Sequence, residues 1–343
     1  MFKSTKLNKT YNFILKLIII SASFGYIYYQ LFFNENYEKV WNLYALTYSW
    51  EKTLFMLLLI LCLMILNWSI EAYKWRYLIK KIEKISFAKA FKAVFAGLSV
   101  SAFTPNRIGE FLGRVFILQK ANPWKAIFIS FLCSMSQLII TLLMGSVSVI
   151  IYILVFYSKQ HLIPTSFLYL VLSLLIIADL IILSVFFNVS FISKWLNILI
   201  KPKWRRMKGY LKVFSFFKIY ELRNVLAFSL LRYFVFSFQF YLLLRFFGIP
   251  LNIFEGIFLI SLVYFVLSAI PSIALAEIGI RGSVAMGVFD YYYNTTLHLN
   301  VNYNFAVVAA SSVLWLVNIA LPAFIGNFYV VKLNFFKVNK QEG

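Results

Sequence analysis

The sequence has few charged residues, and acidic residues are the rarest of them. Charged residues make up 13% of the 343 residues, against about a quarter in an ordinary soluble domain. Hydrophobic residues make up 62%, and the mean hydropathy is +0.82. A soluble core of this size cannot bury so much apolar surface. The composition therefore excludes an ordinary soluble enzyme and predicts an all-α polytopic membrane protein.

The sequence also lacks the residue groupings that mark most catalytic and metal sites. Its two cysteines, Cys62 and Cys133, lie in separate apolar runs and are expected to be small core side chains. Its two histidines, His161 and His298, stand alone in loops. The sequence contains no glycine-rich phosphate loop and no nucleophile elbow. We therefore expect no metal, no cofactor and no catalytic residue.

Positive charge, by contrast, is abundant. Lys and Arg number 33 against 12 Asp and Glu, which gives a formal net charge of +21. Nucleic-acid-binding proteins can share this balance but not this hydrophobicity, so we expect no nucleic-acid partner. Basic residues beside membrane spans indicate topology first and contacts to anionic phospholipid headgroups second. The strongest example is the basic segment 188–223, which we expect to be cytoplasmic.

Six apolar segments are long enough to cross a bilayer, which takes about 20 helical residues. They are residues 13–33, 53–70, 125–157, 165–187, 224–247 and 303–331. The lysines before the first segment resemble the start of a signal peptide. The apolar run continues without a clear small-residue cleavage site, so we expect a retained span. The polar, aromatic stretch after it is expected to lie in the membrane interface.

Two further apolar regions are too short and too polar to be ordinary spans. Residues 87–119 are interrupted at Pro105, and residues 251–289 are interrupted at Pro271. Proline removes a backbone donor and disfavours helix in the residue before it, so we expect helix breaks at both positions. Inside a membrane such breaks need protein or water to cover the backbone. We expect two re-entrant helical hairpins; the alternative is a chain of eight spans.

Six crossings place both termini on one side of the membrane. If that side is the cytoplasm, 25 Lys and Arg fall in cytoplasmic segments and three fall outside. This asymmetry follows the positive-inside rule and fixes the predicted orientation, although it does not distinguish hairpins from full crossings. We expect a single transmembrane domain over residues 1–343 with both termini cytoplasmic.

The two broken regions resemble each other. Residues 101–114 and 268–282 each contain Ser-Ala, then a proline, then Glu-x-x-x-Arg. The chain also divides into halves, at about 11–157 and 163–332, that each run span, span, hairpin, span. Because the halves begin on opposite sides, we expect an inverted-topology repeat of the kind found in transporters.

The ionisable residues in these apolar segments are candidates for a functional site. Glu110 and Arg114 are four residues apart, as are Glu277 and Arg281, so each pair can form a salt bridge on one helix face. Each pair either locks its hairpin or lines a polar cavity that contacts a lipid headgroup. The predicted headgroup-binding residues are Arg107, Glu110, Arg114, Arg232, Gln239, Glu277 and Arg281.

Some of these residues carry more specific expectations. Arg107 lies just after the first break without an obvious partner, which makes it the best single candidate for a phosphate contact. Arg232 and Gln239 are seven residues apart and would share one face of their span. Arg245 is expected to snorkel toward the outer interface. Asp179 lies deep in an apolar span and could pair with an arginine or take part in proton coupling.

Three motifs resemble those of the lysylphosphatidylglycerol synthase transmembrane-region family, also called flippase-like domain proteins. They are TPNRIGEFLGR at 104–114, WRYL at 75–78 and AEIGIRG at 276–282. The last motif departs from the family, whose approach to the glutamate is usually glycine-rich. The resemblance covers nearly the whole chain. It implies a multi-pass protein of the bacterial inner membrane that moves lipids between leaflets.

In one member of that family, the multiple peptide resistance factor, this region is joined to a soluble aminoacyl-transferase domain. This sequence contains no such domain, so we expect no lysyl transfer. The leading hypothesis is a flippase-like transporter for a phospholipid or related lipid. The alternatives are a lipid-modifying transferase and a non-transporting membrane partner of a cell-envelope synthesis enzyme. Expected partners are membrane lipids, a second copy of the chain, or such an enzyme.

Overall fold

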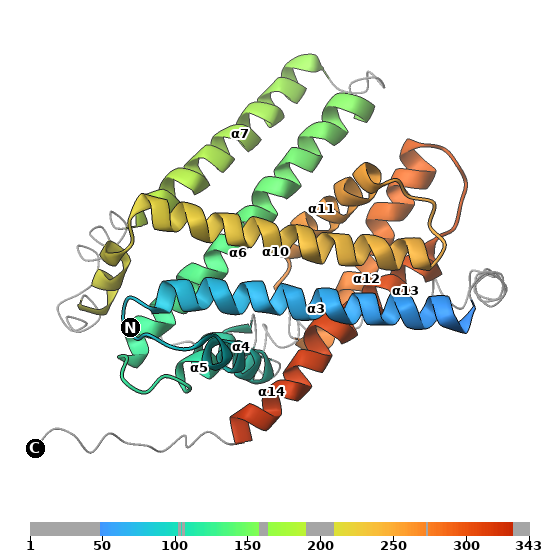
Figure 1. Cartoon of the computed structure of the whole chain (residues 1–343). Helices are drawn as coiled ribbons and strands as arrows, with labels where there is room; N and C mark the ends of the chain where they lie inside the picture. Colours follow the sequence, from blue (N-terminus) through green and yellow to red (C-terminus); the bar gives the residue numbers. More distant parts are fainter. Residues whose placement is uncertain are drawn as a thin grey trace, which may run out of the picture. The chain divides into compact units, whose positions relative to one another are not determined.

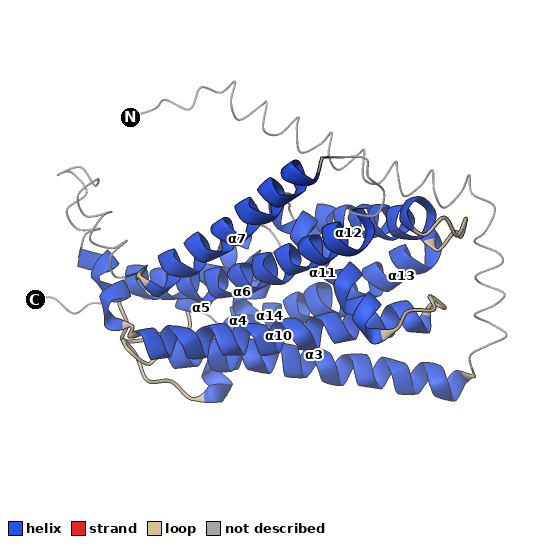
Figure 2. Cartoon of the chain, turned by 90° about the horizontal axis from the view of Figure 1, so that it is seen from above, coloured by secondary structure: helices blue, strands red, loops and turns tan. Residues whose placement is uncertain are grey.

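The computed structural model describes residues 49–101, 104, 107–157, 164–189, 209–271 and 274–331, and these ranges are helical with no strand (Figures 1 and 2). The predicted all-α class is confirmed. The ten α-helices of the described ranges are α3 (Trp50–Ile79), α4 (Phe87–Ser101), α5 (Gly109–Val115), α6 (Pro123–Tyr152), α7 (Thr165–Phe187), α10 (Ile219–Phe246), α11 (Ile253–Ala269), α12 (Ala274–Asp290), α13 (Asn304–Trp315) and α14 (Leu321–Val331).

Five helical segments are long and apolar enough to cross a membrane. They are Trp50–Ile79, Pro123–Val155, Ser166–Phe187, Ile219–Phe246 and Asn304–Val330. These segments coincide with five of the six predicted spans. The sixth predicted span, residues 13–33, and the interfacial stretch after it lie outside the described residues. The chain is therefore a multi-pass membrane protein.

The helix α7 shows most clearly what the long helices face. Only 6% of its most apolar 18-residue window is buried within the protein. Large apolar side chains such as Leu174 and Ile181 are more than half exposed. Exposed apolar surface on this scale has no favourable place in water, so this helix is suited to contact with lipid acyl chains.

The helix α3 continues beyond the predicted span 53–70. The apolar run of the sequence ends at Ile70. The helix instead continues to Ile79, and Glu71 and Lys74 are buried in the protein with 2% and 0% exposure. The reason is that each charge finds an opposite charge inside the fold, so the helix need not stop where the apolar run stops.

Both broken regions form short helices on either side of an interruption, as predicted. The helix α11 ends at Ala269, Ile270 has an extended backbone, and α12 begins at Ala274, which confirms the break at Pro271. In the first region α4 ends at Ser101 and α5 begins at Gly109; Pro105 itself lies outside the described residues. The helix α5 ends at Val115, four residues before the predicted end of the region.

The chain forms two compact units. Unit 1 comprises Met1–Leu63, Thr141–Ile176 and Val235–Val317, and unit 2 comprises Met64–Ile140, Ile177–Phe234 and Asn318–Gly343. In unit 1, α12 packs against both α11 and α13. In unit 2, α4 packs against both α5 and α14 (Figure 1). The helices α3, α6, α7 and α10 each contribute residues to both units.

A π-helical turn, Leu316–Ala320, joins α13 to α14. Its wider turn leaves backbone groups open to other partners. The carbonyl oxygen of Asn318 accepts a hydrogen bond from the Trp68 indole nitrogen at 3.2 Å, and the Asn318 side-chain oxygen accepts one from the Asn67 amide at 3.4 Å. Asn318 therefore anchors the middle of the last apolar segment to α3 within unit 2.

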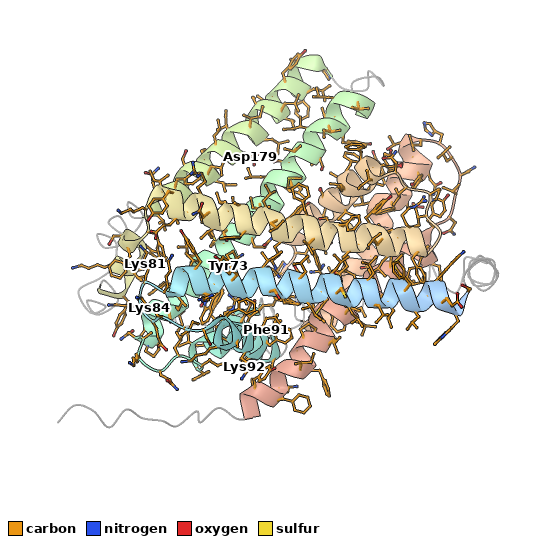
Figure 3. All side chains as sticks on the ribbon, in the orientation of Figure 1. Tyr73, Lys81, Lys84, Phe91, Lys92 and Asp179 are labelled. Carbon is orange, nitrogen blue, oxygen red and sulfur yellow. The ribbon has the colours of Figure 1, made fainter. Side chains whose placement is uncertain are left out.

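Lysines gather where α3 ends. Lys81 and Lys84 follow its last turn, and Lys92 lies on α4 (Figure 3).

Of the predicted cytoplasmic segment 188–223, residues 190–208 lie outside the described ranges, as do both chain termini. The orientation, the cytoplasmic termini, the re-entrant hairpins and the inverted repeat stay predictions.

Candidate functional site

The carboxylate of Glu71 is the centre of a buried charge network in unit 2. Its Oε2 atom lies 2.9 Å from Lys74 Nζ and 3.1 Å from Arg232 Nη1. Its Oε1 atom lies 2.9 Å from Arg114 Nη2. One anion thus receives three cations from three different helices, α3, α5 and α10.

Arg114 connects Glu71 to a second carboxylate. Arg114 is fully buried, and its guanidinium also forms an ion pair with Glu110, one turn earlier on α5. Its Nη1 atom lies 3.8 Å from the Cys133 sulfur, while its buried Nε atom has no hydrogen-bond partner. A buried N–H without a partner is uncommon, because the lost hydrogen bonds to water are not replaced.

Glycines bring Arg114 into this position by letting α5 lie directly against α4. A Cβ atom at Gly113 would lie 2.6 Å from the carbonyl oxygen of Ala96, and one at Gly97 would lie 2.7 Å from that of Glu110. Only glycine, which has no side chain, lets the two backbones approach each other this closely. The short helix is thereby fixed with Arg114 directed into the protein.

Lys74 is held on the other side of Glu71. It is completely buried, and its ammonium group donates to the Ser229 hydroxyl at 3.1 Å. Ser229 in turn lies 2.8 Å from the hydroxyl of Ser136 on α6. These polar partners replace part of the hydration that the buried ammonium loses.

Arg232 is the most exposed cation of the network, with 17% of its side chain accessible. Its Nε donates to Asn67 Oδ1 at 3.1 Å, and its Nη1 donates to Gln137 Oε1 at 3.5 Å as well as to Glu71. The guanidinium carbon lies 4.7 Å from the centre of the Trp68 ring, within the range of a cation–π contact. Among the described residues its Nη2 has no partner.

The charges of the network do not cancel. Its charged members are Glu71, Glu110, Lys74, Arg114 and Arg232, which are three cations and two anions. Their mutual pairing offsets much of the free energy that burial costs, and removing one partner from a buried pair typically costs about 3–5 kcal/mol. One positive charge remains in excess, and Arg232 is where it is most accessible.

The structure bears out several expectations about local pairing. Glu110 and Arg114 form the predicted salt bridge, and so do Glu277 and Arg281 on α12, where Arg281 Nη2 lies 2.6 Å from Glu277 Oε1. The two pairs belong to different units. Arg245 is exposed, and Cys133 is buried as expected, whereas Cys62 is exposed rather than buried.

Three further polar residues are singled out by the sequence. Gln239 is fully buried in unit 1, where it donates to the carbonyl oxygen of Ile60 at 2.9 Å, and its predicted headgroup contact stays a prediction. Arg107 has a left-handed backbone with φ of 56° and is not without interactions within the protein, and its predicted phosphate contact stays a prediction. Asp179 lies midway along α7 and also has interactions of its own (Figure 3).

Sequence reasoning missed Glu71 and Lys74, which are the most central residues. Both fall in a charge-dense stretch that resembles the flank of a span. The available signal was their spacing, because a glutamate and a lysine three residues apart continue one helix face from Asn67. Asn67, Gln137 and Ser229 were missed as well, since isolated polar residues in apolar helices carry no motif.

No group of three or more His, Cys, Asp or Glu side chains that could hold a metal ion is found in the described ranges.

The lysylphosphatidylglycerol synthase TM region family matches residues 13–326 of the chain. This match spans both units and all three motifs. No curated protein and no solved structure matches the chain.

Proposed function

Since the chain belongs to the lysylphosphatidylglycerol synthase TM region family, we propose that it is a flippase-like transporter of lipids. The lipid would be a phospholipid or a relative with a polar headgroup, moved between the leaflets of a bacterial inner membrane. The observation that carries the proposal is the buried network around Glu71, in which the short helix α5 meets α3 and α10, two helices long and apolar enough to span a membrane.

Charged side chains inside a membrane are costly, and they are usually found where an ion or a polar substrate passes. Three cations and two anions leave this network with a net positive charge. The excess positive charge at Arg232 suits a phosphate group, and a guanidinium is the side chain best matched to phosphate oxygens. The network therefore supports recognition of an anionic headgroup.

The position of Arg232 supports the same conclusion. It is the fourteenth of the 28 residues of α10, close to the middle of a candidate span. Asn67, Gln137, Glu71 and Trp68 hold the guanidinium and leave Nη2 for a ligand. A rigid donor costs little conformational entropy on binding. Arg107, Gln239, Glu277 and Arg281 stay in the proposal as further headgroup contacts.

Transport by reconstituted protein tests this function. Purified protein is placed in vesicles that contain a headgroup-labelled phospholipid, and a membrane-impermeant quencher then reports how fast inner-leaflet label reaches the outer leaflet. We expect Arg232→Gln to slow this exchange at least about tenfold, because a charge-assisted hydrogen bond contributes about 1.5–3 kcal/mol. Arg107→Ala and Glu110→Ala are expected to abolish it while leaving membrane insertion intact.

The matched control is Arg245→Gln, which removes an exposed arginine from the same helix. We expect exchange by this variant to stay at the wild-type rate. An Arg232→Gln protein that elutes and unfolds like the wild type, yet exchanges lipid equally fast, would contradict the proposal. A protein that exchanges no labelled lipid but converts it chemically would favour the transferase hypothesis instead.

A further inference from the structure

A second polar cluster lies in unit 1, where Glu255 meets a group of tyrosines. Glu255 is in the first turn of α11, and its carboxylate Oε1 lies 3.5 Å from the hydroxyl of Tyr293. Tyr292 lies beside Tyr293, and the two rings are in contact. Tyr292 and Tyr293 follow α12 in a π-helical turn and are both buried. The cluster thus joins the start of one helix to the end of another.

No cation among the described residues forms an ion pair with Glu255. The same holds for Asp290, the last residue of α12. Between residues 248 and 304 the sequence contains a single Lys or Arg, Arg281, which is paired with Glu277. Acidic residues therefore outnumber basic ones in this segment, although the whole chain has a net charge of +21.

Local structure fixes the position of the Glu255 carboxylate. The Asn252 side chain accepts a hydrogen bond from the Glu255 backbone nitrogen at 2.8 Å, which fixes the first turn of α11. The partial positive charge at a helix N-terminus stabilises an anion there. The tyrosine hydroxyls add hydrogen-bond donors. Glu255 is also partly exposed, so its charge is open to a ligand.

The rings around the carboxylate suit an organic cation. The Tyr292 and Tyr293 rings lie edge to face with centres 5.3 Å apart, and the Tyr303 ring meets Tyr293 in the same way at 5.1 Å. The ring centres of Phe258 and Tyr292 are 6.0 Å apart. Ring faces and carboxylates both attract positive charge, so a carboxylate beside a group of aromatic rings can bind an ammonium group.

We propose that the Glu255 cluster, formed by Glu255, Tyr292, Tyr293 and Tyr303, binds an organic ammonium group. The group is a protonated amine or a quaternary ammonium, carried either by a lipid headgroup or by a small soluble molecule. This site is separate from the network around Glu71 and does not depend on the transport proposal. In the predicted orientation it lies at the outer face of the membrane.

Choline binding to the full-length protein in a neutral detergent tests the site. Saturation-transfer NMR follows choline over a concentration series, and glycerol serves as an uncharged reference ligand. We expect the wild type to bind choline and not glycerol. Glu255→Gln is expected to weaken choline binding about tenfold or more, as the loss of a contact to a charged group does. Tyr293→Phe keeps the ring and is expected to retain most of the binding.

The control variant is Glu51→Gln, which removes an exposed carboxylate from the first turn of α3 in the same unit. It is expected to bind choline like the wild type. Equal choline binding by the wild type and by a folded Glu255→Gln protein would overturn the proposal, and so would equal losses in both glutamate variants.

Nanodiscs distinguish the two sources of the ammonium group. Choline is titrated into protein held in phosphatidylglycerol discs and into protein held in discs that also contain phosphatidylcholine. Loss of choline binding only in the second discs assigns the site to lipid headgroups. Equal, Glu255-dependent binding in both discs assigns it to a soluble amine. Absence of binding in phosphatidylglycerol discs would contradict the site altogether.

Discussion

Glu83 shows how one buried acid can order a loop. Its carboxylate accepts hydrogen bonds from the backbone nitrogens of Gln119, Lys120 and Ala121, at 3.1, 2.8 and 2.9 Å, and forms an ion pair with Lys89 at 3.2 Å. Glu83 thereby ties the turn after α3 to the loop that precedes α6. Burial alone would raise the pKa of Glu83, but these donors outweigh burial and lower the pKa below its usual value of 4.5.

This lowered pKa makes the stability contribution of Glu83 depend on pH. A carboxylate whose pKa is lower in the folded state stabilises the fold above its unfolded pKa and loses that contribution as pH falls through the folded pKa. We expect Glu83→Gln to lower the unfolding temperature at pH 7. The difference from the wild type should shrink as the pH drops below about 4.5. Thermal unfolding in detergent across this pH range measures both effects.

Glu51→Gln serves as the comparison, because Glu51 is an exposed carboxylate. We expect it to change the unfolding temperature little at any pH. A Glu83→Gln protein whose deficit is as large at pH 3.5 as at pH 7 would show that the ionised carboxylate is not what holds the loop.

At the scale of elements, the close packing of α5 against α4 fixes the geometry of Arg114. We expect Gly113→Ala to separate the two helices, because the new methyl group would meet the backbone of Ala96 and Gly97 at 2.6 Å. Backbone atoms cannot yield as a flexible side chain can, and such overpacking costs about 1–3 kcal/mol. The expected result is a lower unfolding temperature and slower lipid exchange.

Gly287→Ala provides the matched control for this substitution. Gly287 is also within a helix, α12, but a Cβ atom there would meet nothing within 4 Å. Alanine favours helix over glycine by about 1 kcal/mol, so this change should leave stability equal or slightly higher. If both alanine variants unfold at the wild-type temperature, the α4–α5 contact is not a close one.

At the scale of the whole molecule, the elements could be predicted far better than the site. The long spans follow from apolar length alone, and Pro271 marks its break because proline cannot continue a helix. The pairs of α5 and α12 follow from i,i+4 spacing. The contacts of Glu71 could not be predicted, because Arg114 is 43 residues away and Arg232 is 161 residues away. A single sequence holds no signal for such distant pairing.

The predicted orientation is itself testable. We expect a cysteine at Tyr291 to react with a membrane-impermeant maleimide in intact cells, and one at Lys84 to react only after the membrane is opened. Both positions are exposed in the structure, so a difference in labelling reports sidedness rather than burial. The substitutions are made with Cys62 replaced by serine, since Cys62 is exposed and would react itself. Labelling of both sites from the same side would reject this topology.

The remaining cysteine has a consequence of a different kind. The sulfur of Cys133 is buried between the two central residues of the network, 3.5 Å from Glu71 Oε1 and 3.8 Å from Arg114 Nη1. A thiol reagent can reach it only when those charges draw apart. In a protein whose Cys62 is replaced by serine, Cys133 therefore reports on the place where a passing headgroup would have to separate the helices. The rate at which Cys133 is modified measures how often the network opens.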